Sequence, residues 1–232
     1  MAPPADLPSN VRVSSHPCLI AKLGQLRSAS ATPREVKALV HEISLILGCE
    51  ALASALTSTP GSKDKSPLGF EYTGADVSPG TVSIVPILRS GLAMVEGIQS
   101  ILPRAVPVHH LGLYREPLTL EPVEYYNNLP HHVSSTSDPS SAPSSLAIIV
   151  DPIIATGGTC AAAIQTLKEW GVQKVLVISL LGASEGIQRA AGAWAEGTEI
   201  WVAGVDPEIT KDGMLKPGLG DIGDRLFLTL GK

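Results

Sequence analysis

The sequence predicts an α/β protein with a doubly wound, mainly parallel central sheet and flanking helices. Strongly apolar runs of strand length occur at residues 81–88, 146–150 and 174–181. Each run is followed by a segment compatible with a helix, so the order strand, helix, strand repeats along the chain. Repeats of this kind pair their strands in parallel through right-handed crossovers. We therefore expect a ligand at the carboxyl edge of the sheet.

Local signals predict the remaining elements. Thr32, Pro33 and Glu35 form a capping-box pattern that opens a helix with one buried apolar face, and Gly171 ends a later helix. The pattern further predicts, in chain order, a polar loop at 58–67, a short hairpin around Gly74 within 68–78, a helix at 91–101, a strand at 106–113, a helix at 184–194 capped by Ser184 and a strand at 199–205.

Composition excludes several classes of function. The 232-residue chain is 44% hydrophobic and 17% charged, so we expect a folded protein with some surface buried in an oligomer. A net charge of -5 and 4% aromatic residues argue against a nucleic acid partner. The three cysteines lack CxxC spacing, which indicates free thiols in a reducing compartment. With no signal peptide and no long apolar run, the sequence predicts a cytoplasmic protein without a membrane partner.

Three regions define the expected domain organisation. Residues 1–15, which begin with a proline-rich stretch, are predicted to be a flexible tail, and residues 16–232 a single domain. Residues 131–145 are rich in serine and cannot supply a core, so this insertion is expected to be flexible.

The stretch LAIIVDPIIATGGTCAAAI, residues 146–164, indicates a phosphate site. A helix begins at residues 156–159, where the first N–H groups have no intrahelical partner and can bind an anion. The glycines permit close approach, and the threonines add hydroxyl donors. Asp151, at the end of the strand, can accept hydrogen bonds from sugar hydroxyls, so the stretch fits a ribose 5-phosphate. A plain turn with Thr156 or Thr159 as the N-cap remains an alternative.

Two further residues near strand ends have alternative interpretations. Arg89 follows the buried run at 81–88, where its guanidinium could hold phosphate oxygens, although a surface ion pair is the more frequent role of a lone arginine. Cys160 follows the turn at a helix start, where a thiolate could be stabilised, but a small core residue is the favoured interpretation.

The C-terminal stretch GMLKPGLGDIGDRLF predicts an irregular loop with backbone groups left for a ligand. Gly213, Gly218, Gly220, Gly223 and Pro217 all interrupt regular structure. The alternative is a glycine-rich turn in which Asp221 and Asp224 are exposed to solvent.

Three motifs carry a resemblance to one family. VDPIIATGGT resembles the phosphoribosyl pyrophosphate (PRPP) motif of phosphoribosyltransferases, in the form with one acid followed by proline that is typical of uracil phosphoribosyltransferases. VPILRSGLAMVEGI and GMLKPGLGDIGDRLF agree, in the right order, and the match runs from about His16 to the C-terminus. The resemblance implies a type I phosphoribosyltransferase fold with a β-arm or hood, and transfer of the phosphoribosyl group to N1 of uracil to give UMP and pyrophosphate.

The same resemblance assigns site residues. It implies catalytic roles for Asp151, Arg89 and Asp221, and PRPP binding by Arg89, Arg115, Asp151, Pro152, Ile153, Ile154, Ala155, Thr156, Gly157, Gly158, Thr159 and Asp221. Uracil binding is implied for Leu215, Gly220, Asp221 and Ile222, while Met214 stands where many members have tyrosine.

The resemblance also implies partners and leaves two alternatives. Mg²⁺ would be carried by PRPP without a direct protein ligand, Asp221 acting through water. A homodimer or homotetramer and a GTP effector are further implications. The first alternative is a catalytically weakened PRPP- or nucleotide-binding regulatory protein of the same fold. The second is a phosphoribosyltransferase for another base, which is disfavoured because the loop GLGDIGDR resembles the uracil branch.

Overall fold

The computed structural model describes residues 7–116, 119, 121–130 and 143–229. These residues form an eight-stranded sheet in which every neighbouring pair is parallel except β5 and β6. The strand order is β1 (Val11–Val13), β10 (Thr198–Asp206), β9 (Lys174–Ala183), β7 (Leu146–Val150), β4 (Val82–Leu88), β5 (Leu111–Arg115) and β6 (Pro122–Asn127), with β8 (Ile153–Ile154) beside β9. The predicted mainly parallel sheet is confirmed.

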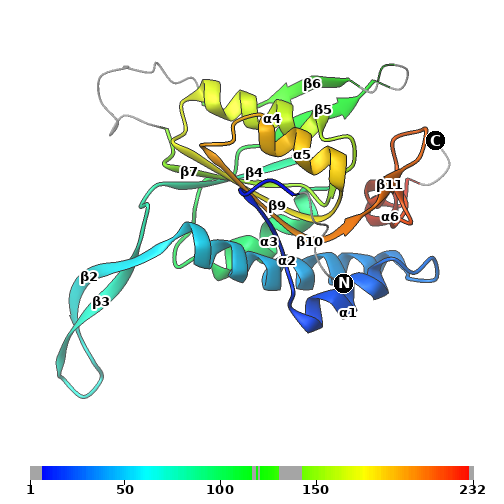
Figure 1. Ribbon diagram of the computed structural model, residues 1–232. Coiled ribbons are helices and arrows are strands. Elements are labelled where there is room, and N and C mark those ends of the chain that lie inside the picture. Colours follow the sequence, from blue (N-terminus) through cyan, green and yellow to red (C-terminus); the bar gives the residue numbers. More distant parts are fainter. Residues whose placement is uncertain (1–6, 117–118, 120, 131–142, 230–232) are drawn as a thin grey trace.

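Helices cover both faces of the sheet, as a doubly wound fold requires (Figure 1). One face carries α1 (Pro17–Leu26), α2 (Pro33–Ala55) and α3 (Leu92–Ile101), and the other carries α4 (Gly158–Trp170) and α5 (Ser184–Gly192).

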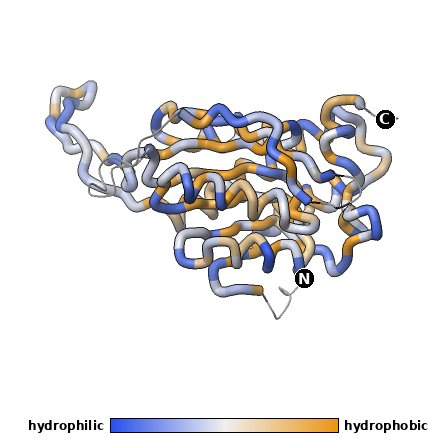
Figure 2. The backbone as a smooth tube through the Cα atoms, turned by 90° about the horizontal axis from the view of Figure 1, so that it is seen from above, coloured by the Kyte–Doolittle hydropathy of each residue, from blue (hydrophilic) through white to orange (hydrophobic). Residues whose placement is uncertain are grey.

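Alternate strand residues supply two hydrophobic cores. In β7, Ile148 joins the core beneath α2 and Ile149 joins the core beneath α4, and both side chains are fully buried. The apolar run is therefore continuous because both faces of the strand are covered. Figure 2 shows the hydrophobic segments concentrated in the body of the molecule.

Helix α2 begins with the predicted capping box. The Thr32 hydroxyl accepts from the backbone N–H of Glu35 at 3.4 Å, and the Glu35 carboxylate accepts from the N–H of Thr32 at 2.7 Å. By length and hydropathy alone this 23-residue helix could cross a membrane. Its apolar side, which includes Val40, Ile43 and Leu47, is buried in the core.

Residues 57–78 form a β-arm that differs from the loop and short hairpin predicted for residues 58–78. The antiparallel strands β2 (Thr57–Lys65) and β3 (Glu71–Ser78) form a long hairpin that projects from the body (Figure 1). Its turn lies at residues 66–70, where the N–H of Ser66 donates to the carbonyl of Phe70 at 2.9 Å, and not around Gly74. Most residues of both strands are exposed or half-buried, so no buried alternation marked them in the sequence.

Three smaller corrections concern segment ends. Strand β1 pairs with β10, so the flexible tail predicted for residues 1–15 is too long. Directly before β1, the side chain of Asn10 donates to the carbonyl of Thr198 at 3.0 Å and holds the start of β1 against β10. Strand β5 begins at Leu111, later than predicted. Helix α5 is preceded by Ala183 and has no side-chain cap from Ser184.

The serine-rich insertion lies mostly outside the described residues, as does 1–6. At its end, Ser144 is buried and its hydroxyl donates to the carbonyl of Leu146 at 2.9 Å. The expected flexibility is therefore wrong for this residue, because the hydroxyl anchors it to the first residue of β7.

Candidate active site

The candidate site lies between β4 and β7, where the direction in which the chain adds strands to the sheet reverses. From β4 the chain continues to β5 on one side, whereas from β7 it continues to β9 on the other. The loops after these adjacent strands diverge and leave a crevice at their carboxyl ends, the usual ligand position in open α/β sheets. A cavity of about 260 Å³ opens there, lined by Arg89 after β4 and by Asp151 after β7.

The TGGT turn, residues 156–159, forms one wall of this cavity. Thr156, Gly157 and Thr159 line it, and Gly157 immediately precedes α4 with φ +77°. No side chain caps the helix, so the alternative with Thr156 or Thr159 as an N-cap is wrong. The first N–H groups of α4 are therefore left for another acceptor.

Asp151 is held at the base of the cavity. It is 7% exposed, and the hydroxyl of Ser90 donates to its Oδ1 at 3.3 Å. Its backbone N–H donates to the carbonyl of Ile178 at 3.3 Å, which ties the residue to β9. The carboxylate is thus held by Ser90, in the loop after β4, and the backbone by Ile178 of β9.

Arg89 both lines the cavity and makes the ion pair considered as its alternative role. Its Nη2 lies 3.3 Å from Asp224 Oδ1, and its Nη1 donates to the hydroxyl of Thr229 at 3.3 Å. The peptide bond between Leu88 and Arg89 is cis. The pair is partly exposed, so the guanidinium is oriented without being enclosed.

The glycine-rich loop, residues 213–223, forms the opposite wall. Its first part pairs β12 (Leu215–Lys216) with β11 (Glu208–Ile209), and its end leads into α6 (Ile222–Phe227). Asp221 is exposed, and its carboxylate caps α6 by accepting from the N–H of Asp224 at 3.0 Å. All four residues predicted to contact a base, Leu215, Gly220, Asp221 and Ile222, line the cavity.

The structure does not bring every predicted residue to the cavity wall. Pro152 and Gly158 do not line it; the Pro152 carbonyl instead accepts from the N–H groups of Leu180 and Leu181 at 3.1 and 3.0 Å. The backbone of Arg115 ends β5, and its side chain lies outside the described part of the chain. Ile153, Ile154 and Ala155 do line the cavity.

Several lining residues had no assigned role in the sequence analysis. Ser90 could have been found from its place beside Arg89, and Met214 from its place beside Leu215. Tyr114 and Leu219 carried the same signal, from their places beside Arg115 and Gly220, whereas the approach of Leu113 depends on how separate segments pack. The complete set without an assigned site role is Ile87, Leu88, Ser90, Leu113, Tyr114, Cys160, Gly213, Met214, Leu219 and Gly223.

Cys160 behaves as a core residue and not as a reactive thiolate. Its side chain is buried, and burial, with a smaller effect from the negative charge of Asp151, raises the pKa of the thiol far above its usual value. The packing interpretation is confirmed.

The cavity offers oxygen donors but no preformed metal cage. Within the described residues, no group of three or more His, Cys, Asp and Glu side chains is placed to hold a metal ion. The carboxylates of Asp151 and Asp221 both line the cavity, and carboxylate oxygens are the ligands that Mg²⁺ prefers. The donor set therefore fits a magnesium ion that arrives with its own phosphate ligands.

The fold and the site together define a type I phosphoribosyltransferase. The family model for uracil phosphoribosyltransferase matches residues 13–229, and the chain belongs to this family. It is 39% identical over 221 residues to a uracil phosphoribosyltransferase of Finegoldia magna, with 95% of this chain and 99% of the relative covered. The corresponding protein of Dictyoglomus turgidum is 38% identical over 219 residues, covering 94% and 99%. A solved protein from Aquifex aeolicus matches with TM-score 0.83 and 29% identity, covering 94% and 98%.

Proposed function

We propose that this enzyme transfers the phosphoribosyl group of PRPP to N1 of uracil, giving UMP and pyrophosphate. One observation carries the proposal within the family assignment: a single cavity is lined by Arg89 of the first motif, by Asp151 and the TGGT turn of the PRPP motif, and by the glycine-rich loop. The three motifs, distant in sequence, thus meet around a space where a sugar phosphate and a base could lie together. Catalysis would consist of alignment and stabilisation of charge.

The sugar phosphate is proposed to bind along residues 151–159. The N–H groups at the start of α4 and the threonine hydroxyls of the TGGT turn would hold the 5′-phosphate. Asp151 would accept hydrogen bonds from the ribose hydroxyls, a role supported by its buried position and by the Ser90 hydroxyl that orients it. Fixing the ribose in this way would leave C1′ facing the glycine-rich loop.

The pyrophosphate is proposed to leave toward Arg89, assisted by Arg115. As the bond from C1′ to the pyrophosphate oxygen lengthens, positive charge develops on the ribose ring and negative charge on the leaving group. A guanidinium can hold two phosphate oxygens at once, and Arg89 lies at the cavity with its orientation set by Asp224.

Magnesium is proposed to enter with PRPP. Asp221 would hold it through water, and the ion would supply neutralisation of the pyrophosphate charge. The hydrogen bond that Asp221 Oδ1 accepts from the N–H of Asp224 limits how far this carboxylate can turn.

The base is proposed to lie against Leu215, Gly220, Asp221 and Ile222. Backbone N–H and C=O groups of the glycine-rich loop would pair with the alternating acceptors and donor of uracil. Cytosine would present a donor where uracil has an acceptor and leave a buried group unpaired, which is a strong basis for rejection.

Pyrophosphate release tests this function. Purified protein is given PRPP and magnesium with uracil, cytosine, orotate or hypoxanthine in separate reactions. We expect release, with UMP formation, for uracil alone. Release with another base would reassign the substrate, and PRPP binding without release for any base would indicate the regulatory alternative.

Three further proposals concern assembly, regulation and location. A homodimer or homotetramer is supported by the exposed apolar side chains of Leu68 and Phe70 on the β2–β3 hairpin, 84% and 71% exposed. Light scattering would measure the mass in solution.

A GTP effector is proposed from family membership, and adding GTP to the assay would test it. We propose a cytoplasmic location, which cell fractionation would test.

A further inference from the structure

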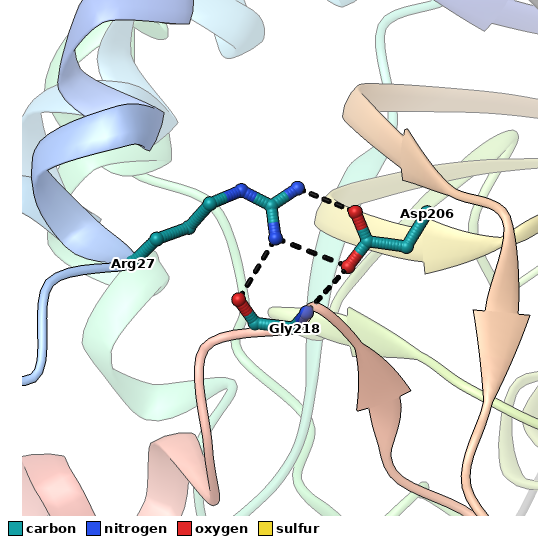
Figure 3. A network of polar contacts seen from close by, with 3 residues as sticks. All are labelled: Arg27, Asp206 and Gly218. Carbon is teal, nitrogen blue, oxygen red and sulfur yellow. Dashed lines mark hydrogen bonds and ion pairs between the residues drawn. The ribbon is translucent and has the colours of Figure 1, made fainter.

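The glycine-rich loop is tied to the N-terminal part of the chain by an ion pair whose two residues, Arg27 and Asp206, lie outside the three motifs. Arg27, which follows α1, forms an ion pair with Asp206 at the end of β10, its Nη2 lying 2.5 Å from Oδ1 (Figure 3). Asp206 is 2% exposed, whereas the side chain of Arg27 is 27% exposed. A nearly buried carboxylate of this kind is costly unless it is fully paired.

The partner that makes this pair informative is Gly218. Its N–H donates to Asp206 Oδ2 at 2.9 Å, and its carbonyl accepts from Arg27 Nη1 at 2.8 Å (Figure 3). Both backbone polar groups of one loop residue are therefore held by the two halves of a single ion pair.

A second arginine fixes the next residue of the loop. Arg225 Nη1 donates to the carbonyls of Leu219 and Leu26, at 2.7 Å each, and its Nη2 donates to the carbonyl of Ser28 at 2.8 Å. Guanidinium groups thus bind two consecutive loop carbonyls, those of Gly218 and Leu219. Arg27 itself follows α1, and Arg225 also binds the carbonyls of Leu26 and Ser28, so both arginines link the loop to the end of α1. Leu219 and Gly220 then line the cavity.

We propose that Arg27 is a positioning residue for the base-binding wall of the cavity, acting through Asp206 and Gly218 without touching the substrate. Backbone groups can recognise a base only if their peptide planes keep a fixed orientation. A glycine-rich backbone can adopt many conformations, so other contacts must fix the orientation of these peptide planes. The Arg27 clamp removes that freedom at Gly218, directly before the lining residues. This inference rests on the proposed assignment of the glycine-rich loop to uracil.

Arg27→Lys and Arg27→Gln test the proposal. Lysine keeps a positive charge beside Asp206 and so protects the fold, but it lacks the planar fork that reaches Asp206 and the Gly218 carbonyl together. We expect Arg27→Gln to raise the KM for uracil by at least about tenfold and to lower the uracil-to-cytosine preference, while the KM for PRPP stays within about twofold. Arg27→Lys should give an intermediate KM for uracil.

Lys22→Gln is the matched control. Lys22 lies on α1, the helix that directly precedes Arg27, in an ion pair with Glu42 at 2.6 Å, and neither Lys22 nor Glu42 lines the cavity. The control should leave both KM values unchanged. Thermal melting of every variant would check that the folded fraction is the same at the assay temperature.

Ile222→Ala separates this proposal from the assignment of the base site, because Ile222 lines the cavity directly. If Ile222→Ala raises the KM for uracil and both folded Arg27 variants leave it unchanged, the positioning role is wrong. Equal rises in the two KM values of the Arg27 variants would also overturn it. If Ile222→Ala and the Arg27 variants all leave the KM for uracil unchanged, the base-site assignment fails, and the positioning role falls with it.

Discussion

Gly157 and Gly186 lie with their backbones in direct contact, so that a Cβ atom added to Gly157 would stand 2.1 Å from the carbonyl oxygen of Gly186. The contact is reciprocal, since a Cβ on Gly186 would stand 3.0 Å from the nitrogen of Gly157 and 1.9 Å from the carbonyl oxygen of the nearby Ala155. The TGGT turn therefore rests on the first turn of α5, and its position depends on a residue outside the PRPP motif.

Gly186→Ala should displace the TGGT turn and weaken PRPP binding. Backbone blocks the added methyl group, so we expect a loss of about 1–3 kcal/mol in stability and a rise of at least roughly tenfold in the KM for PRPP. Gly192→Ala in the same helix is the control, because a Cβ there meets nothing within 4 Å. Steady-state kinetics and thermal melting measure both effects, and an unchanged KM for PRPP in Gly186→Ala would contradict the dependence.

Arg89→Lys should impair the reaction much more than it impairs folding. Lysine cannot hold two phosphate oxygens in a planar fork, so kcat/KM for PRPP should fall on the order of 10- to 100-fold. The ion pair with Asp224 is partly exposed, so stability should change by less than about 1 kcal/mol. Arg104→Lys, which alters the exposed pair with Asp76, is the control. Equal kinetics in the two variants would remove Arg89 from the pyrophosphate site.

The sequence predicted those parts of the fold and site that leave a local trace. Strands β4, β7 and β9 are predominantly apolar because both sheet faces are covered, and Arg89 and Asp151 could be placed because each directly follows such a strand. The capping box of α2 could also be predicted, because its two residues are only three positions apart in the sequence.

The features that escaped prediction depend on contacts between distant segments. Arg27 and Asp206 are 179 positions apart, and neither belongs to a cavity motif. The β2–β3 hairpin lacks a buried face, so its strands have no hydrophobic alternation to detect. Pro152 lies inside the PRPP motif but bonds to β9, which shows that a motif contains residues that support the turn as well as residues that reach the ligand.

Asp151→Asn should remove most of the activity while preserving the fold. The amide has the same shape, but it replaces one acceptor oxygen by a donor and removes the negative charge opposite the developing positive ribose. We expect kcat to fall on the order of 100-fold or more. Asp76→Asn, at an exposed ion pair on β3, should retain full activity. Turnover by Asp151→Asn at the normal rate would sink the proposed role in ribose binding.

Cys160 should stay unreactive in the native enzyme although it lines the cavity. Burial raises the pKa of its thiol, so the thiolate is suppressed at every pH below that raised value, and alkylation should remain slow from about pH 6 to about pH 9. Replacing the exposed Cys18 and Cys49 by alanine leaves Cys160 as the sole thiol of the chain. Iodoacetamide, followed by mass spectrometry, should label this variant only after denaturation.

Cys160→Ala should keep its activity within about twofold and lose about 1 kcal/mol of stability through lost packing. Rapid labelling of the native variant, or an inactive Cys160→Ala enzyme that is still folded, would assign the thiol a role in the reaction.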